Sequence, residues 1–138
     1  MRSVLGIGLI LVIVALGGVG VAGAQQGLTK QDRQGPVTVA VTLTAPPAVG
    51  MPVRAKVVLD AHSVGFDGVV FEQVVALRTS DASDMAPTAV EQVKGSGHHR
   101  EALLVFPPVP DGGAVRIVVK DVGGVPERTF VWEPAAKP

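Results

Sequence analysis

The fold class is decided by residues 37–44, which read VTVAVTLT. Valine or leucine occupies every second position of this run, and threonine or alanine occupies the positions between them. Successive side chains of a β-strand point to opposite faces, so this alternation is typical of a strand with one buried and one exposed face. Ala45-Pro46-Pro47 ends the run, because proline cannot donate a hydrogen bond to a sheet.

Outward from this strand, similar patterns recur along the chain, separated by turns rich in glycine and proline. We expect strands over 53–60, 69–79, 100–106, 114–122 and 127–133, with a short edge strand over 88–94. No segment after residue 36 has a helical period. Six or seven short strands in about 100 residues are typical of an all-β, immunoglobulin-like antiparallel β-sandwich, and a small antiparallel barrel is the alternative. Trp132 and the four phenylalanines are expected in its core.

The N-terminal residues have the order of a secretory signal peptide. Arg2 supplies a positive charge, residues 4–21 are uncharged and mostly apolar, and Ala22-Gly23-Ala24 is a small-residue cleavage signature. The domains expected are a signal helix over 1–24, a flexible leader over 25–35, the sandwich over 36–133 and a tail over 134–138. A retained anchor is the alternative, because the run of about 18 residues is near the lower limit for spanning hydrocarbon. Cleavage predicts an exported protein, periplasmic or extracellular, without a membrane span.

Charge and cysteine content limit the kinds of partner. The chain has 12 basic and 12 acidic residues, and loss of Arg2 with the signal would leave 11 against 12, a net charge of −1. Scattered charges of both signs argue against a nucleic-acid partner, which would need a basic stripe. Cysteine is absent, so the chain has no ligands for thiolate zinc, iron–sulfur or blue-copper sites.

All three histidines fall into two short motifs, Asp60-Ala-His62-Ser63 and Gly97-His98-His99-Arg100-Glu101. Each motif has a histidine and a carboxylate two positions apart, and residues at that spacing share a face of a strand. Two such pairs on neighbouring strands, or at one end of the sandwich, would offer nitrogen and oxygen ligands for zinc or copper(II). The metal-ligand candidates are therefore His62, His99, His98, Asp60 and Glu101. Strand alternation turns His98 the other way unless a flexible hinge over Gly95–Gly97 lets it swing.

The competing interpretation is that the histidine motifs are structural. Aspartate and serine side chains commonly bond to local backbone amides at the end of a strand. Catalysis has little support, because Ser63 sits beside His62 without a nucleophile elbow and no paired-carboxylate motif is present. We therefore expect a non-enzymatic domain that either binds copper(II) or zinc, or serves as a protein-interaction or structural accessory module of a periplasmic or surface assembly.

Three segments together carry a resemblance: LDAHSV (59–64), GHHREALLVF (97–106) and GVPERTFVW (124–132). In combination and order they resemble an uncharacterised group of bacterial exported β-sandwich domains with Asp-x-His-Ser, Gly-His-His and Glu-Arg-x-Phe-x-Trp motifs. The resemblance covers residues 36–133 and implies that both histidine segments belong to one architectural plan, without implying an activity. Glu127 and Arg128 open the last strand, where they form a surface ion pair or orient the histidine end.

Overall fold

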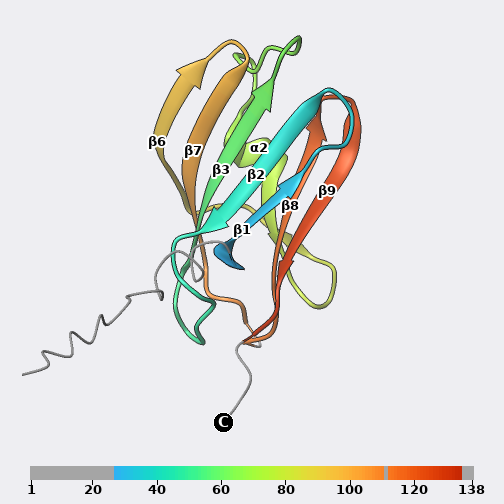
Figure 1. Ribbon diagram of the computed structural model, residues 1–138. Coiled ribbons are helices and arrows are strands. Elements are labelled where there is room, and N and C mark those ends of the chain that lie inside the picture. Colours follow the sequence, from blue (N-terminus) through green and yellow to red (C-terminus); the bar gives the residue numbers. More distant parts are fainter. Residues whose placement is uncertain (1–26, 111, 135–138) are drawn as a thin grey trace, which may run out of the picture.

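The computed structural model describes residues 27–110 and 112–134, and these residues form two antiparallel β-sheets (Figure 1). The five-stranded sheet has the order β1-β2-β3-β7-β6, and the four-stranded sheet has the order β5-β4-β8-β9. The strands are β1 (Thr29–Asp32), β2 (Val37–Leu43), β3 (Val53–Ala61), β4 (Val75–Arg78), β5 (Asp84–Met85), β6 (Ala89–Ser96), β7 (His99–Phe106), β8 (Val115–Val122) and β9 (Val125–Trp132), with one short helix, α2 (Phe71–Val74).

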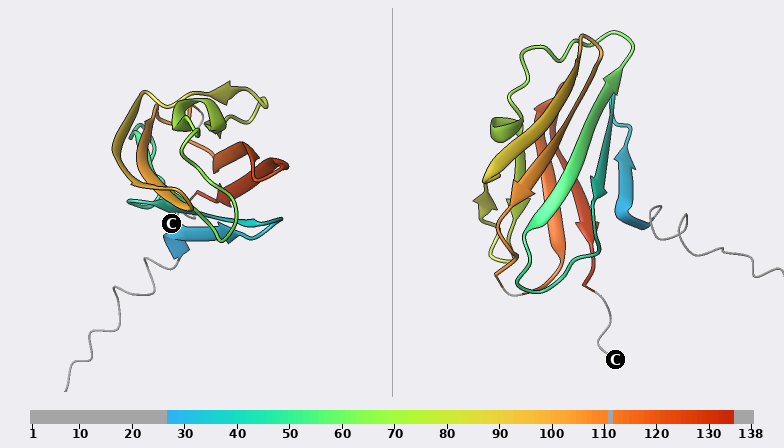
Figure 2. Two further views of the ribbon diagram at one scale, coloured as in Figure 1. Left: turned by 90° about the horizontal axis from the view of Figure 1, so that it is seen from above. Right: turned by 90° about the vertical axis from the view of Figure 1, so that its left-hand side faces the viewer.

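The strand order confirms the expected immunoglobulin-like sandwich. When β2 to β9 are read as strands A, B, C, C′, D, E, F and G, the first sheet is A-B-E-D and the second is C′-C-F-G. Figure 2 shows the two sheets as separate layers that enclose the interior. No β-pairing joins them within the described residues, which distinguishes this sandwich from the small barrel considered as the alternative.

The core lies between the layers and is built from the inward positions of the alternating strands. β2 follows the burial pattern expected for VTVAVTL, with its four apolar side chains at most 2% exposed. All four phenylalanines and Trp132 are buried, as expected. The expected signal helix and most of the tail lie outside the described residues. No helix within the described ranges is long and apolar enough to cross a membrane.

The leader expected over 25–35 differs from the structure, because β1 (Thr29–Asp32) pairs with β2 along its whole length. The sequence TKQD has no apolar alternation, so pattern alone gave no sign of a strand. Its inward-facing side chains are polar and reach the opposite sheet: Lys30 lies 5.9 Å from the Trp132 ring centre, and Asp32 bonds to Arg128. The sandwich therefore begins earlier than residue 36.

The strand expected over 69–79 is a shorter strand preceded by one helical turn, α2. Backbone bonds from Gln73 and Val74 to the Val70 carbonyl form this turn. Phe71 and Val75 are both buried and stand four positions apart, which is the spacing of one face of a helix. The many apolar residues of this segment therefore concealed the change from a helical period to a strand period at Val75.

The edge strand expected over 88–94 is confirmed and extends to Ser96 as β6. Gly95 is a fixed member of this strand rather than part of a flexible hinge. It has φ of +84°, and a Cβ atom there would lie 2.2 Å from the His99 carbonyl oxygen. Gly97 and His98 form a two-residue turn between β6 and β7, with a positive φ at Gly97 as in a type II′ hairpin.

Candidate functional site

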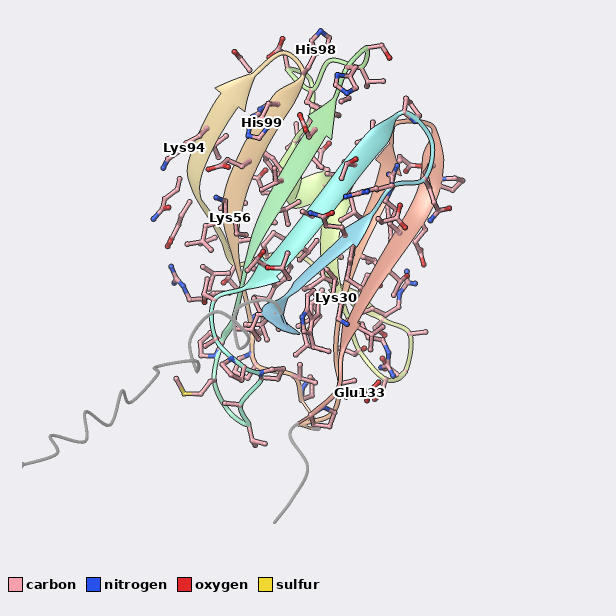
Figure 3. The ribbon with its side chains drawn as sticks, viewed as in Figure 1. Lys30, Lys56, Lys94, His98, His99 and Glu133 are labelled. Atoms are coloured by element: carbon pink, nitrogen blue, oxygen red, sulfur yellow. The ribbon has the colours of Figure 1, made fainter. Side chains whose placement is uncertain are left out.

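The two histidine motifs lie side by side at one end of the sandwich, because β3 and β7 are neighbouring antiparallel strands. Their register places Asp60 directly opposite His99. This is the adjacency on which the metal hypothesis depends, and it brings Asp60, His99 and Glu101 together on the outer face of the five-stranded sheet. Figure 3 shows His99 on this face and His98 at the tip of the β6–β7 turn.

The His99 ring is half exposed and has a carboxylate near each nitrogen. Its Nδ1 atom is 3.5 Å from Oδ1 of Asp60, and its Nε2 atom is 3.7 Å from Oε2 of Glu101. Glu101 also forms an ion pair with Lys56, whose Nζ atom is 3.3 Å from Oε2 of Glu101. Because the two carboxylates approach different ring nitrogens, an ion bound at one nitrogen has only one of these carboxylates beside it. The arrangement is a row of alternating charges along two strands.

His62 does not join this row. It follows the last residue of β3, is exposed, and makes no hydrogen bond or ion pair with any residue that the structure describes. Over residues 27–110 and 112–134, no group of three or more histidine, aspartate or glutamate side chains is arranged to hold a metal ion. Of the expected ligands His62, His98, His99, Asp60 and Glu101, only Asp60, His99 and Glu101 are brought together.

His98 faces away from His99, as strand alternation predicts, and it has a structural partner. Its Nδ1 atom is 2.8 Å from the Val64 carbonyl oxygen, so this nitrogen carries the proton and donates. Val64 belongs to residues 62–70, here called the crossover, which carry the chain from β3 to α2 and the other sheet (Figures 1 and 2). His98 therefore fastens the crossover to the β6–β7 turn.

Neighbouring groups of the same turn also hold the crossover. The Gly97 carbonyl accepts from the Phe66 amide at 2.8 Å, and the Gly97 amide donates to Oδ1 of Asp67 at 2.9 Å. Arg100 donates from one guanidinium nitrogen to the carbonyls of Phe66 and Val69, both at 2.8 Å. We call these contacts, together with the His98 bond, the clasp.

The clasp encloses apolar side chains as well as polar bonds. Phe66 is 1% exposed, and the Arg100 guanidinium lies 5.3 Å from the ring centre of Phe71. A guanidinium at that distance from an aromatic face adds a cation–π attraction. Sequence reasoning identified the histidines but missed the roles of Asp67 and Arg100. The Asp67-Gly68 turn signal was the only sign of the first, and Arg100 gave no sign because its acceptors are backbone carbonyls of a distant loop.

Arg128 lies elsewhere and corrects two expectations for the last strand. Its side chain is fully buried, donates to Oδ1 of Asp32 at 3.0 Å, and donates to the carbonyls of Gln34 at 2.8 Å and Val122 at 2.6 Å. It therefore neither forms a surface pair with Glu127 nor orients a histidine. Its three acceptors surround all of its nitrogens, which is how a buried guanidinium is stabilised. We call this group the Arg128 clamp.

The electrostatics of the clamp favour ionised Asp32. Desolvation alone would raise the pKa of Asp32, but hydrogen bonds from Gln34 and Arg128 outweigh it and leave that pKa below its ordinary value. The clamp joins the β1–β2 connection to the β8–β9 hairpin, so it closes the sandwich where no backbone ladder links the two sheets.

Glu127 points to the outer face of the four-stranded sheet and pairs with Arg78 at 2.9 Å. Arg78 also binds both carboxylate oxygens of Asp84, and Lys120 contacts Asp84 from β8, on the far side of β4. The Arg78 hydrogen bonds, with those of Lys120, lower the pKa of Asp84 to about 2. This network spans β4, β5, β8 and β9, and none of its hydrogen bonds or ion pairs among the described residues includes a residue of the histidine motifs.

We compared the chain with protein-family models, curated proteins and solved structures, and nothing matched in any of the three comparisons.

Proposed function

We propose that this chain is an exported, non-catalytic β-sandwich domain that works as an interaction module, and that its Gly-His-His-Arg segment is a structural clasp. The observation that supports this proposal most strongly is the use made of that segment. Polar groups of Gly97, His98 and Arg100 form five hydrogen bonds with the crossover, each 2.8 or 2.9 Å long. Polar groups engaged in this way hold structure rather than await a substrate.

The clasp supports an interaction role because it fixes the surface around it. A loop that is already held in place loses little conformational entropy when a partner binds, so its exposed side chains are preorganised for recognition. Asp60, His62 and His99 are among the exposed polar side chains of this end and take no part in the clasp. We propose that they form the contact surface for a protein partner in the periplasm or at the cell surface.

Site-directed photo-crosslinking in bacteria that express the full chain tests this surface. A photoreactive amino acid at position 62 should give a discrete crosslinked product with one protein. The matched control is position 81, which is also exposed but lies in the β4–β5 turn. The proposal predicts a product from position 62 that position 81 does not give. No product from position 62, or the same products from both positions, contradicts it.

A second candidate function is binding of copper(II) or zinc through His99. One observation favours it: the separation of 3.5 Å between Nδ1 of His99 and Oδ1 of Asp60 is close to that of two ligands on one ion with bonds of about 2.0–2.2 Å. Calorimetry should then detect one ion bound with micromolar or tighter affinity, lost in His99→Ala. Absence of binding heat with either metal overturns this candidate.

A further inference from the structure

The end of the sandwich opposite the clasp is apolar and exposed. It is formed by the β2–β3 loop, residues 44–52, and the β7–β8 loop, residues 107–114, of which residue 111 is not described. Val49 is 81% exposed and Met51 is 59% exposed, the two most exposed large apolar side chains in the described residues. Three prolines in each loop, at 46, 47 and 52 and at 107, 108 and 110, remove backbone N–H donors from this end.

Two adjoining hollows open on this end. One has a volume of about 170 Å³ and the other about 220 Å³, and both are lined by Pro47, Ala48, Val53 and Val115. Arg54 is the only charged residue among the described residues that line them. Lys30 and Glu133 line a third, more open hollow with Pro46 and Pro47, and Figure 3 shows both charged residues toward this end. This surface therefore consists of apolar loops with charged residues at its rim.

The chain enters the domain at the same end. Gly27 and Leu28 line the third hollow together with Pro46 and Pro47. The uncharged apolar run of residues 4–21 precedes Gly27 by only a few residues. Residues 22–27 can span at most about 20 Å when fully extended. A bilayer that held the apolar run would therefore lie within about 20 Å of the apolar end.

We propose that the chain keeps its apolar run as a membrane anchor and that the apolar end of the domain rests on the lipid bilayer. Val49 and Met51 enter the interface between headgroups and acyl chains, where exposed apolar side chains are favoured. Arg54 and Lys30 at the rim lie level with the lipid phosphates, as long basic side chains do beside apolar contact surfaces. The clasp then faces away from the membrane, toward any protein partner.

The chain has no cysteine, so a single introduced cysteine carries the fluorescent label at one chosen position. Full-length Val49→Cys and Val93→Cys, each labelled with a small fluorophore, are reconstituted into phosphatidylcholine vesicles with or without brominated acyl chains. Val93 is the matched control, because it is an exposed valine on the β6 edge. Quenching by brominated lipid should be several-fold stronger at position 49, and quenching by aqueous iodide should be stronger at position 93.

Equal iodide access at the two positions, without lipid quenching at position 49, overturns the proposal. Shielding of position 49 from iodide without lipid quenching also overturns it, because some other part of the protein would then cover this end. The intact mass of the protein from bacterial membranes tests the anchor separately. A chain that retains residues 4–21 is expected, and a soluble chain that begins at Gln25 contradicts the proposal.

Discussion

The clasp and the Arg128 clamp both hold a connecting segment with an arginine, but they differ in burial and in what their loss would expose. The Arg128 side chain is fully buried and pairs with a carboxylate as well as two carbonyls. Arg100 is only partly buried and donates to carbonyls alone. A buried charge must be completely satisfied, whereas a half-exposed polar group can recruit water. We therefore expect the clamp to contribute more to stability than the clasp, although the clamp is remote from the histidines.

The largest effect is expected from Arg128→Ala, which would remove the ion-pair partner of Asp32, leaving that carboxylate with its Gln34 bonds, and would remove the guanidinium donors of the Gln34 and Val122 carbonyls. Breaking a buried pair by removing one partner costs about 3–5 kcal/mol. Urea denaturation should show this loss of unfolding free energy, and Arg128→Lys should recover only part of it, because an ammonium cannot reproduce the three directions of the fork. Arg116→Ala is the control, since Arg116 makes no ion pair with described residues. An equal loss of unfolding free energy in Arg128→Ala and Arg116→Ala would contradict the prediction that the buried clamp stabilises the domain.

Arg100→Met should have the next largest effect. The substitution keeps an unbranched apolar side chain but removes the guanidinium, so the Val69 carbonyl loses the Arg100 donor and the Phe66 carbonyl keeps only its bond from the Val69 amide. We expect a cost of about 1–3 kcal/mol. Amide hydrogen exchange should also quicken in residues 62–70 more than in β8. Lys94→Met serves as the control on the neighbouring strand. If exchange in the crossover is unchanged, the clasp does not hold it.

Acid should have the smallest effect, through Asp84. The folded-state pKa of Asp84, about 2, lies below the usual value near 3.8, so the stability it contributes is present above pH 4 and is lost as the pH falls toward 2. Asp84 lies near the surface, where solvent screens its ion pairs, so it contributes at most about 1 kcal/mol to the free energy of unfolding. Melting temperatures measured from pH 5 to pH 2 should fall less steeply in Asp84→Asn than in the native chain. Glu72→Gln, at an exposed site, should leave the slope unchanged.

Sequence predicted the parts of this fold that depend on local alternation. β2 and β3 read clearly because their apolar residues recur every second position and face one core. β1 was missed because Lys30 and Asp32 are inward-facing and polar, and their partners lie about a hundred residues away in β9. The same distance in sequence hid the burial of Arg128. Burial of a charge depends on acceptors that only the assembled sandwich supplies.

The histidine end was predicted in outline but not in role. Strand spacing put Asp60 with His62 and His99 with Glu101 and turned His98 to the other side, but it left open whether the two strands are neighbours. The structure makes them neighbours and places Asp60 opposite His99. It could not show that the crossover would pass beneath the β6–β7 turn and offer Val64 and Phe66 as backbone partners. Loop paths depend on long-range packing, so the choice between a structural and a ligand-binding histidine needed the structure.

The most direct test of the clasp compares His98→Ala with His99→Ala, two neighbours of identical chemistry. His98 donates to the Val64 carbonyl, whereas His99 is half exposed beside two carboxylates. Denaturant unfolding at pH 7 should show a loss of about 1 kcal/mol for His98→Ala and less than about 0.5 kcal/mol for His99→Ala. An equal loss, or a larger loss for His99→Ala, would contradict the account that the Gly-His-His-Arg segment works through the crossover.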